Sequence, residues 1–268
     1  MPFINRAGAI ISGGSGGGGT STKYGVSSET LYGDGVDGTY EFPTSVTNWD
    51  SSGADWNDVC DRAFEYKFYR GNLQSANFSN LTLISGEYAF QMGFNYNEQL
   101  TNIAFSNLVS ITGIWAFYQA FMNCYSLQAV SFDNLQSITA RRAFASAFAG
   151  CRKLTSVSFP KLKTITGDGV FSSCFNNSAS LTSLSFPELT SIEGGTSTSS
   201  SAFYNNTTIT RMDFKKLSSI TNDYLFYNCS KLTELHFGAA NQEAIEASSG
   251  YATLWGRGAG NATVYFDL

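Results

Sequence analysis

Apolar residues recur along this chain with a period of 27 residues. Each repeat follows the rule L-x-x-V-x-F-x-x-L-x-x-I, most clearly over residues 154–165. The segments begin at Leu73, Leu100, Leu127, Leu154, Leu181, Ile209 and Leu232. The first four intervals are 27 residues long, the next is 28 and the last is 23. A fixed period of this length predicts stacked coils that share one continuous core, which is a solenoid.

Two smaller patterns predict the parts of each coil. Val157 and Phe159 alternate with Ser156 and Ser158, so the segment is predicted to be a strand with the serines pointing outward. Pairs of phenylalanines four residues apart recur in step with it, at 64/68, 90/94, 117/121, 144/148 and 171/175. A spacing of four places both rings on one face of a helical turn, so the second half of each coil is predicted to be short helical or irregular structure. The solenoid is therefore expected to begin with a half coil near Asp58.

The patterns divide the chain into four regions. Residues 1–22 form a Gly-rich arm whose apolar residues are candidates for an assembly contact: Phe3, Ile4, Ile10 and Ile11. Residues 23–57 are predicted to be an N-terminal cap of loops and short strands, 58–239 the repeats, and 240–268 a C-terminal cap. Within the C-terminal cap, residues 240–247 suit a short helix and residues 262–268 a closing strand. Tyr251 and Trp255 are expected to cover the open end. The register slips at 193–202, which predicts a projecting loop that is either functional or inert.

Composition narrows the classes of function. The chain has 268 residues, 22 of them Phe, with 14% charged residues and a net charge of −5. This length suits one elongated domain. No basic run is present, so nucleic acid is not an expected partner. No stretch approaches the roughly 20 apolar residues that span a bilayer, so no membrane insertion is expected. The N-terminus lacks the apolar core of a secretory signal.

Cysteine spacing predicts structural thiols. Cys124, Cys151 and Cys229 each lie three residues before a repeat segment, which favours a small buried thiol in a recurring slot over disulfides or a metal site. No C-x-x-C pair is present, and His236 is the only histidine. Residues 34–38 faintly resemble a calcium loop but lack its further ligands. We expect no cofactor and no metal.

One polar cluster is the candidate binding site. His236 is predicted to lie outward on its strand, near Arg211, Asp213 and Glu234, as a partner-binding patch or as the solvated end of the strand ribbon. No nucleophile, phosphate-loop or zinc motif is present, so the protein is not predicted to be an enzyme. Elsewhere the outward strand positions are small and polar, which suits a broad, shallow contact and not a deep pocket. These positions include Asn102, Ala129, Ser131, Ser156, Ser158, Ser183 and Ser185.

The repeat, followed by A-F-x-x-x-F and C-x-x-L, resembles the BspA-like (Treponema-type) leucine-rich repeats over residues 58–268. The ending at 251–268 also looks like that of short members of this family in gut bacteria and their phages. The resemblance implies a leucine-rich-repeat solenoid of the α/β type. It would have a parallel strand ribbon, short helical or irregular convex segments, and about 6–7 coils of ~27 residues behind the Gly-rich N-terminal arm.

The resemblance implies adhesion to proteins, glycans or cells. Our leading hypothesis is a non-enzymatic phage virion surface protein: a fibre, a decoration protein or a baseplate-linked adhesin. The arm would attach to other virion proteins, and the repeats would contact a host cell-surface protein or glycan. The missing export signal motivates this choice. The alternative is a bacterial cell-surface or secreted leucine-rich-repeat adhesin, and a homo-oligomer is compatible with both.

Overall fold

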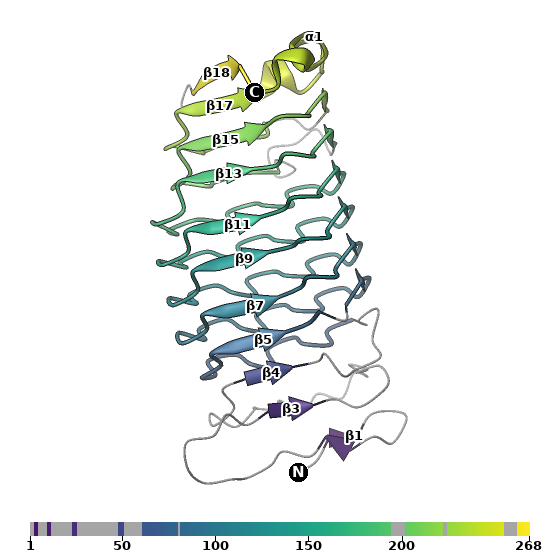
Figure 1. Ribbon diagram of the computed structural model, residues 1–268, viewed down its shortest axis with the longest axis vertical. Coiled ribbons are helices and arrows are strands. Elements are labelled where there is room, and N and C mark those ends of the chain that lie inside the picture. The colour runs from purple at the N-terminus through teal and green to yellow at the C-terminus, as the bar shows by residue number, and fades with distance from the viewer. Residues whose placement is uncertain are drawn as a thin grey trace.

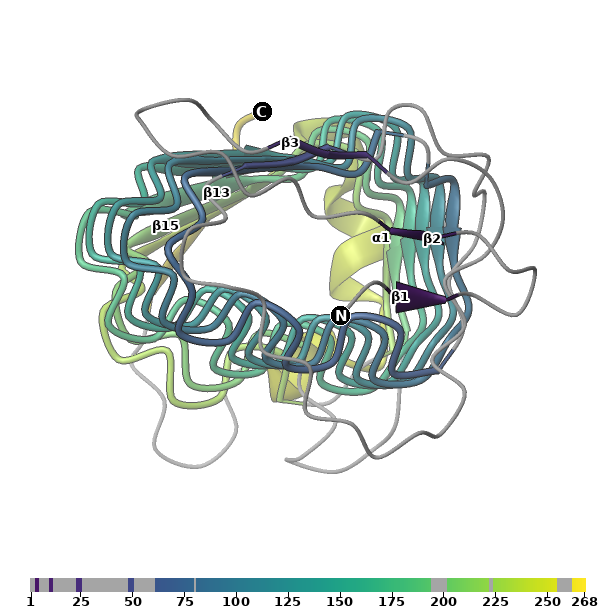
Figure 2. The ribbon, with the colours of Figure 1, turned by 90° about the horizontal axis from the view of Figure 1, so that it is seen from below.

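In the computed structural model, the chain folds into coils stacked along one long axis (Figure 1). The structure describes residues 61–79, 81–193, 202–221, 224–254 and 262–268, and the backbone of four short strands before residue 51. Viewed along the stack, successive coils superimpose closely (Figure 2). Six consecutive coils, those of β5 to β16, each have a strand of three or four residues, a two-residue strand and a turn segment. The solenoid predicted from the 27-residue period is therefore confirmed.

The longer strands form a parallel ribbon along the stack, made of two consecutive sheets (Figure 1). Six pair in the order β11-β9-β7-β5-β4-β3, and four continue it as β13-β15-β17-β18. Their bounds are β3 Lys23–Gly25, β4 Asn48–Asp50, β5 Ser75–Asn77, β7 Asn102–Ala104, β9 Ala129–Ser131, β11 Ser156–Ser158, β13 Ser183–Ser185, β15 Arg211–Phe214, β17 Glu234–Phe237 and β18 Thr263–Phe266. In β11 the central Val157 is buried and its two serine neighbours face outward, as the alternation predicted.

The end of each repeat segment forms a second parallel sheet of two-residue strands, which the sequence did not identify. It runs in the order β16-β14-β12-β10-β8-β6. The bounds are β6 Leu83–Ile84, β8 Ser110–Ile111, β10 Ser137–Ile138, β12 Thr164–Ile165, β14 Ser191–Ile192 and β16 Ser219–Ile220. The isoleucines pair from coil to coil and are fully buried. Each of the two sheets therefore contributes a column of apolar side chains to the same core.

The sequence predicted short helical or irregular structure for the turn segment of each coil. The segment is irregular, so the irregular alternative is confirmed and the helical one is wrong. Every fourth residue has a left-handed backbone: φ is 55° at Tyr88, 51° at Met92 and 60° at Tyr96. Within 88–96, the N–H groups of the even-numbered residues donate to carbonyls of the next coil, and those of residues 91, 93 and 95 donate three residues back. A helix would keep all these donors within one coil. Stacking therefore replaces the helix with a ladder of four-residue turn units.

The four-residue unit also explains the shortened last interval. Phe171 is separated from the next repeat segment by ten residues, whereas Phe203 precedes Ile209 by six. The later coils thus lack one turn unit, and the second phenylalanine column ends at Phe175. The described coils keep their register despite this loss, because Met212 still pairs with Leu184 in the ribbon.

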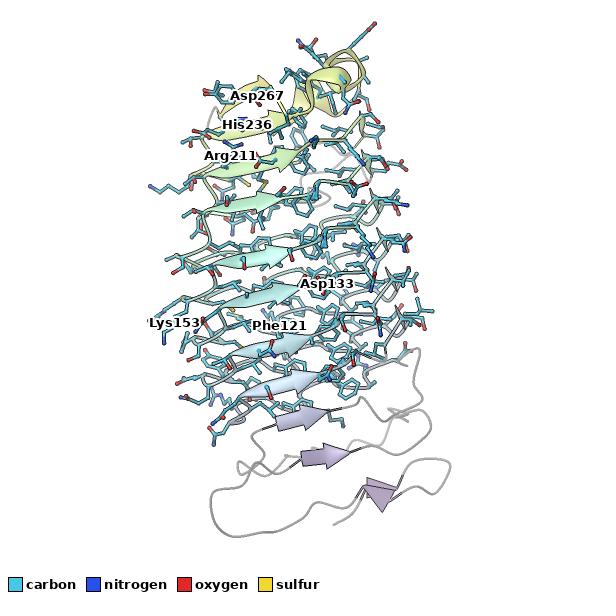
Figure 3. The ribbon with its side chains drawn as sticks, in the orientation of Figure 1. Phe121, Asp133, Lys153, Arg211, His236 and Asp267 are labelled. Atoms are coloured by element: carbon cyan, nitrogen blue, oxygen red, sulfur yellow. The ribbon has the colours of Figure 1, made fainter. Side chains whose placement is uncertain are left out.

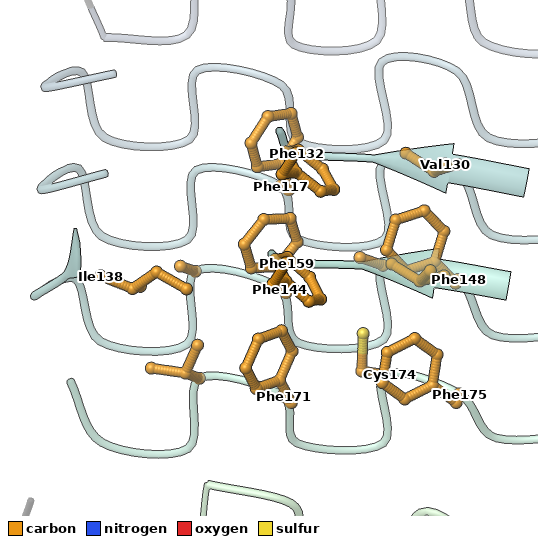
Figure 4. Close-up of a cluster of buried hydrophobic side chains, with 14 of the residues drawn as sticks. Phe117, Val130, Phe132, Ile138, Phe144, Phe148, Phe159, Phe171, Cys174 and Phe175 are labelled. Carbon is orange, nitrogen blue, oxygen red and sulfur yellow. The ribbon is translucent and has the colours of Figure 1, made fainter. Parts of the chain in front are cut away.

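Stacked phenylalanines fill the centre of the solenoid (Figure 4). Phe132 stacks on Phe159 of the next coil with ring centroids 5.2 Å apart, and Phe144 stacks on Phe117 at 5.0 Å. Phe132 and Phe144 meet edge to face at 5.1 Å. Such pairs add roughly 0.5–1.5 kcal/mol beyond the burial of their area. Phe64 and Phe68 begin these columns, as the predicted half coil requires.

A second column inside the solenoid is polar. It lies three residues before each repeat segment and is occupied in successive coils by Asn97, Cys124, Cys151, Ser178, Asn206 and Cys229. Each side chain donates to a main-chain oxygen of the preceding coil; Cys124 Sγ, for example, lies 3.1 Å from Phe94 O. Cys124, Cys151, Cys174 and Cys229 are buried and free. The prediction of structural thiols is confirmed for Cys124, Cys151 and Cys229, and Cys174, which lies outside the recurring slot, is buried as well.

Short elements close the C-terminal end. They are the 3-10 helices η2 Ala239–Asn241 and η3 Tyr251–Thr253, and the helix α1 Gln242–Glu246. The helix and β18 match the predicted short helix and closing strand. Tyr251 packs against the core as expected, whereas Trp255 lies outside the described residues. No helix among the described residues has the length and apolar character needed to cross a membrane.

Several predictions fall on residues that the structure does not describe. They are the loop at 194–201 within the predicted insertion, the weak calcium-loop resemblance at 34–38, and Cys60. The division into arm, N-terminal cap, repeats and C-terminal cap stays a prediction. The strands β3 and β4 extend the ribbon from within the predicted N-terminal cap, in register with β5.

The polar column predicts a sharp contrast between Asn97→Ala and Cys124→Ser in neighbouring coils. Asn97 accepts from the Leu73 N–H at 3.0 Å and donates to the carbonyls of Phe68 and Phe94. Without the Asn97 side chain, these buried polar groups lose their hydrogen-bond partner, so the free energy of unfolding should fall by about 1–3 kcal/mol. Serine can replace the thiol donor, so the second variant should stay within about 1 kcal/mol of the parent. Urea denaturation measures both, and equal losses would contradict this account.

Candidate interaction surface

The outward side of the strand ribbon carries small side chains over several coils. A shallow depression of about 270 Å³ crosses β7, β9 and β11. Ser131 and Ser158 are hydrogen-bonded across two coils at 2.7 Å, and the Ser131 hydroxyl donates to Asp133. We call the outward residues of β7, β9, β11 and β13 the strand face: Asn102, Ala104, Ala129, Ser131, Ser156, Ser158, Ser183 and Ser185. A face this flat suits a broad contact.

A charged cluster lies at the C-terminal end of the same side (Figure 3). The register places Arg211 beside Glu234 and Asp213 beside His236. Arg211 Nε lies 2.8 Å from Asp213 Oδ1, and its Nη1 lies 3.4 Å from Glu234 Oε2. His236 Nε2 lies 3.4 Å from the same Glu234 oxygen. The four residues singled out from the sequence are thus brought together by two paired strands, β15 and β17.

His236 differs from the solvated residue that was one reading of the sequence. Its side chain is only 7% exposed because β18 lies over it. The ring stacks on Tyr265 with centroids 4.5 Å apart, and Nδ1 lies 2.8 Å from Asp267 Oδ1. Tyr265 and Asp267 were missed as members of the cluster. The closing strand was predicted, but its register against β17 had no repeat signal to indicate it.

The cluster is predominantly acidic. Three carboxylates, of Asp213, Glu234 and Asp267, surround the single guanidinium of Arg211. The hydrogen bond to Asp213 raises the pKa of Arg211 above its usual value, aided by the nearby negative charges. Ion pairs this exposed stabilise a fold only weakly. The arrangement instead presents fixed carboxylates that could receive a cationic group of a partner.

The geometry around His236 does not build a nucleophile. Both of its ring nitrogens face carboxylates, so it does not activate a serine or cysteine in the described part of the chain. Burial raises the pKa of the Cys151 and Cys229 thiols to about 12, and raises those of Cys124 and Cys174 well above the usual value. Thiols with such pKa values are poor nucleophiles and poor metal ligands at neutral pH.

Metal binding finds no support in the described ranges of the chain. There, no group of three or more His, Cys, Asp or Glu side chains is arranged to hold an ion. The carboxylates of the charged cluster do not form such a group either. These carboxylates come from β15, from β17 and from Asp267 just after β18, and they are partly taken up by Arg211 and His236.

The candidate assembly residues of the arm come together in pairs. β1 Phe3–Ile4 and β2 Ile10–Ile11 are antiparallel, with Phe3 opposite Ile11 and Ile4 opposite Ile10. Their side chains lie outside the described residues. Their role in attachment stays a prediction.

These features define a class of protein: a repeat solenoid with a flat polar face and no assembled catalytic group among its described residues. The family model described as "BspA type Leucine rich repeat region (6 copies)" matches residues 62–174 and 145–250. Because the two matches together span more than half of the chain, the chain belongs to this family. Leucine-rich-repeat solenoids of this kind are typically interaction scaffolds.

Several solved structures are similar to this chain. One is a leucine-rich repeat protein of T. pallidum, with 20% identity, a TM-score of 0.35, and coverage of 70% of this chain and 68% of the other. Another, from Bacteroides ovatus, has 18% identity, a TM-score of 0.32, and coverage of 85% and 70%. A leucine rich cell surface protein of Faecalibacterium prausnitzii has 17% identity, a TM-score of 0.25, and coverage of 91% and 89%. No curated protein matches the chain.

The contacts of His236 predict that it fastens the last strand. In His236→Ala, the amides of Thr263–Phe266 should exchange with deuterium about tenfold faster, because the Asp267 bond and the Tyr265 stack are lost together. Amides of β9 and β11 should be unchanged. Glu234→Gln is the matched control, since it alters the 3.4 Å contacts of Glu234 with His236 and Arg211 but leaves the Asp267 bond and the Tyr265 stack in place. Unaltered exchange in β18 would contradict this role.

The raised thiol pKa values predict unreactive cysteines in the folded protein. In a Cys60→Ser variant, the four described thiols should react very slowly with a disulfide reagent between pH 7 and 9. Burial disfavours the thiolate, so it stays scarce until the pH nears about 12. Denaturant should release all four. A fast-reacting thiol in the folded variant would contradict the burial of these four thiols.

Proposed function

We propose that this protein is a non-enzymatic adhesion protein whose strand face binds a macromolecule displayed on a cell surface. The observation that carries the proposal is the uninterrupted row of small outward side chains over four consecutive coils. Small side chains leave the backbone ribbon accessible and lose little conformational entropy when they are covered. The face therefore suits a rigid, extended partner surface.

The partner is proposed to be a host cell-surface protein or glycan. Hydroxyl and amide groups on the strand face can donate and accept hydrogen bonds, as Ser131 and Ser158 already do with each other. The acidic cluster at Arg211, Asp213 and Glu234 closes one end of this face and would orient a partner that carries positive charge. Neither feature calls for a deep pocket.

The finer proposal places the protein on a phage particle as a fibre, decoration or baseplate-linked adhesin. The four free, buried thiols suit assembly in a reducing cytoplasm. The strand pair of Phe3–Ile4 with Ile10–Ile11 would provide the contact to other virion proteins or between copies. A bacterial cell-surface or secreted adhesin is the alternative, and family membership agrees equally with both.

Mass spectrometry separates these two placements. Phage particles purified from the strain that encodes the chain should contain its peptides in stoichiometric amounts. The washed bacterial surface without phage should not contain them. Peptides found only in the surface fraction would replace the virion placement with the bacterial one.

Bulky substitutions on the strand face should abolish cell binding. Ala129→Arg with Ser183→Arg adds two large cations to β9 and β13, so binding of the labelled protein to intact host cells should fall by roughly tenfold or more. Thr112→Arg with Thr166→Arg is the matched control, with equal charge and spacing at exposed positions beside the second sheet. Loss of binding in the control alone would contradict the proposed face.

A further inference from the structure

Arginine and aromatic side chains are stacked along the turn side of the first four coils. The rings of Tyr88 and Trp115 are nearly parallel, at 7°, with centroids 6.5 Å apart. The Arg62 guanidinium lies 4.8 Å from the centroid of Tyr88, and that of Arg142 lies 5.0 Å from Trp115. Four coils thus contribute to one continuous stack with a guanidinium at each end.

A second set of stacks lies farther along the same turn segments. The Arg70 guanidinium lies 5.3 Å from the ring of Tyr69 and 5.2 Å from that of Tyr96. The Arg152 guanidinium lies 4.9 Å from the ring of Tyr125. We call the two sets together the turn-face cluster: Arg62, Tyr69, Arg70, Tyr88, Tyr96, Trp115, Tyr125, Arg142 and Arg152.

The charge of this surface is opposite to that of the chain. The turn segments 61–72, 87–99, 114–126 and 141–153 contain seven Lys and Arg against four Asp and Glu, whereas the whole chain has a net charge of −5. The corresponding segments of later coils, 168–180, 202–208 and 224–230, contain no Lys or Arg. The positive surface therefore belongs to the first four coils.

Three of the stacked guanidiniums keep free hydrogen-bonding capacity. Arg62 is paired with Glu65 at 2.7 Å. Arg70, Arg142 and Arg152 have no carboxylate within ion-pairing distance among the residues that the structure describes. Arg70 and Arg152 are exposed, and Arg142 Nε is buried without a hydrogen-bond partner among the described residues. The outer N–H groups of a guanidinium that lies over a ring can donate two hydrogen bonds to a carboxylate.

We propose that the turn-face cluster is a second docking surface, which binds an acidic segment of a partner protein. Trp, Tyr and Arg contribute most of the binding energy in protein interfaces. Here each is held by a stacked neighbour before binding, so less conformational entropy remains to be lost. Carboxylates of the partner would bind Arg70, Arg142 and Arg152, and its apolar side chains would contact the aromatic edges between them.

The geometry favours a protein over a sugar or a nucleic acid. Tyr88 and Trp115 cover one face of each other, and arginines lie over their other sides. No open ring face remains in this stack for a pyranose ring or a base, and stacking on open faces is how aromatic platforms bind bases. Ring edges and guanidinium edges remain, and these suit peptide side chains.

The probe for an acidic protein segment is a fluorescent Glu-Tyr copolymer. Polygalacturonate tests an anionic polysaccharide as the ligand, and self-association of the protein tests a second copy of the chain. The copolymer should bind the full-length protein and weaken as salt rises from about 50 to 300 mM. Arg70→Gln/Arg142→Gln/Arg152→Gln should weaken binding roughly tenfold or more. Lys161→Gln/Lys163→Gln/Lys215→Gln removes equal charge from exposed residues outside these turn segments, and should bind like the parent.

The stacked geometry is tested by replacing the same arginines with lysine. Lysine keeps the charge but not the planar fork, so the triple Arg→Lys variant should recover only part of the affinity. Full recovery, an equal loss in the Lys→Gln control, or tighter binding of polygalacturonate than of the copolymer would each overturn the proposal. If the parent protein self-associates and the Arg→Gln variant does not, the surface binds a second copy of the chain, and the proposal is overturned. Ala129→Arg with Ser183→Arg should leave copolymer binding intact, so failure here is distinguishable from failure of the strand face.

Discussion

Every feature of this protein depends on equivalent residues of successive coils lying in register. The register is maintained by parallel hydrogen bonding in two sheets, by the turn ladder, and by phenylalanine columns that stack from coil to coil. Truncating one fully buried phenylalanine in such a core costs about 3–5 kcal/mol. A slip by one residue would turn Val157 outward and Ser156 inward, so the core itself excludes alternative registers.

Because the inward positions are committed to the core, the outward ones are free to differ between coils. The strand side uses this freedom for small residues and ends in the acidic cluster around His236. The turn side uses it for stacked aromatic and arginine residues in the first four coils, and has no Lys or Arg in its later segments 168–180, 202–208 and 224–230. The polar column shows the same tolerance inside the solenoid, since asparagine, serine and cysteine all satisfy the same carbonyl. One scaffold therefore presents two surfaces of opposite charge.

The periodic features were readable from the sequence, and the features that depend on contacts between coils were not. The alternation at Val157 and Phe159 predicted the strands, and the recurring slot of Cys124 and Cys151 predicted buried thiols. The helical spacing of the phenylalanines was misleading. Bonding to the next coil takes up the N–H groups that a helix would use, and it forces every fourth residue to positive φ.

The missed residues show what a periodic signal can and cannot reveal. Tyr265 and Asp267 cover His236 from a strand outside the repeat, where no period indicates the register. Arg62, Tyr88, Trp115 and Arg142 lie 26, 27 and 27 residues apart, so the same period that revealed the core would have aligned them. They differ in residue type, so a pattern of identical residues does not reveal them.

The most direct test of the central claim is to ask which face becomes covered when the protein is bound to its target cells. An environment-sensitive fluorophore at Ser156→Cys would report on the strand face, and one at Thr139→Cys would report on an exposed position beside the second sheet. The buried native thiols leave these sites addressable in a Cys60→Ser background. We expect the emission to shift on cell binding at position 156 and not at 139. A shift at 139 with none at 156 would show that the strand face is not the surface that binds.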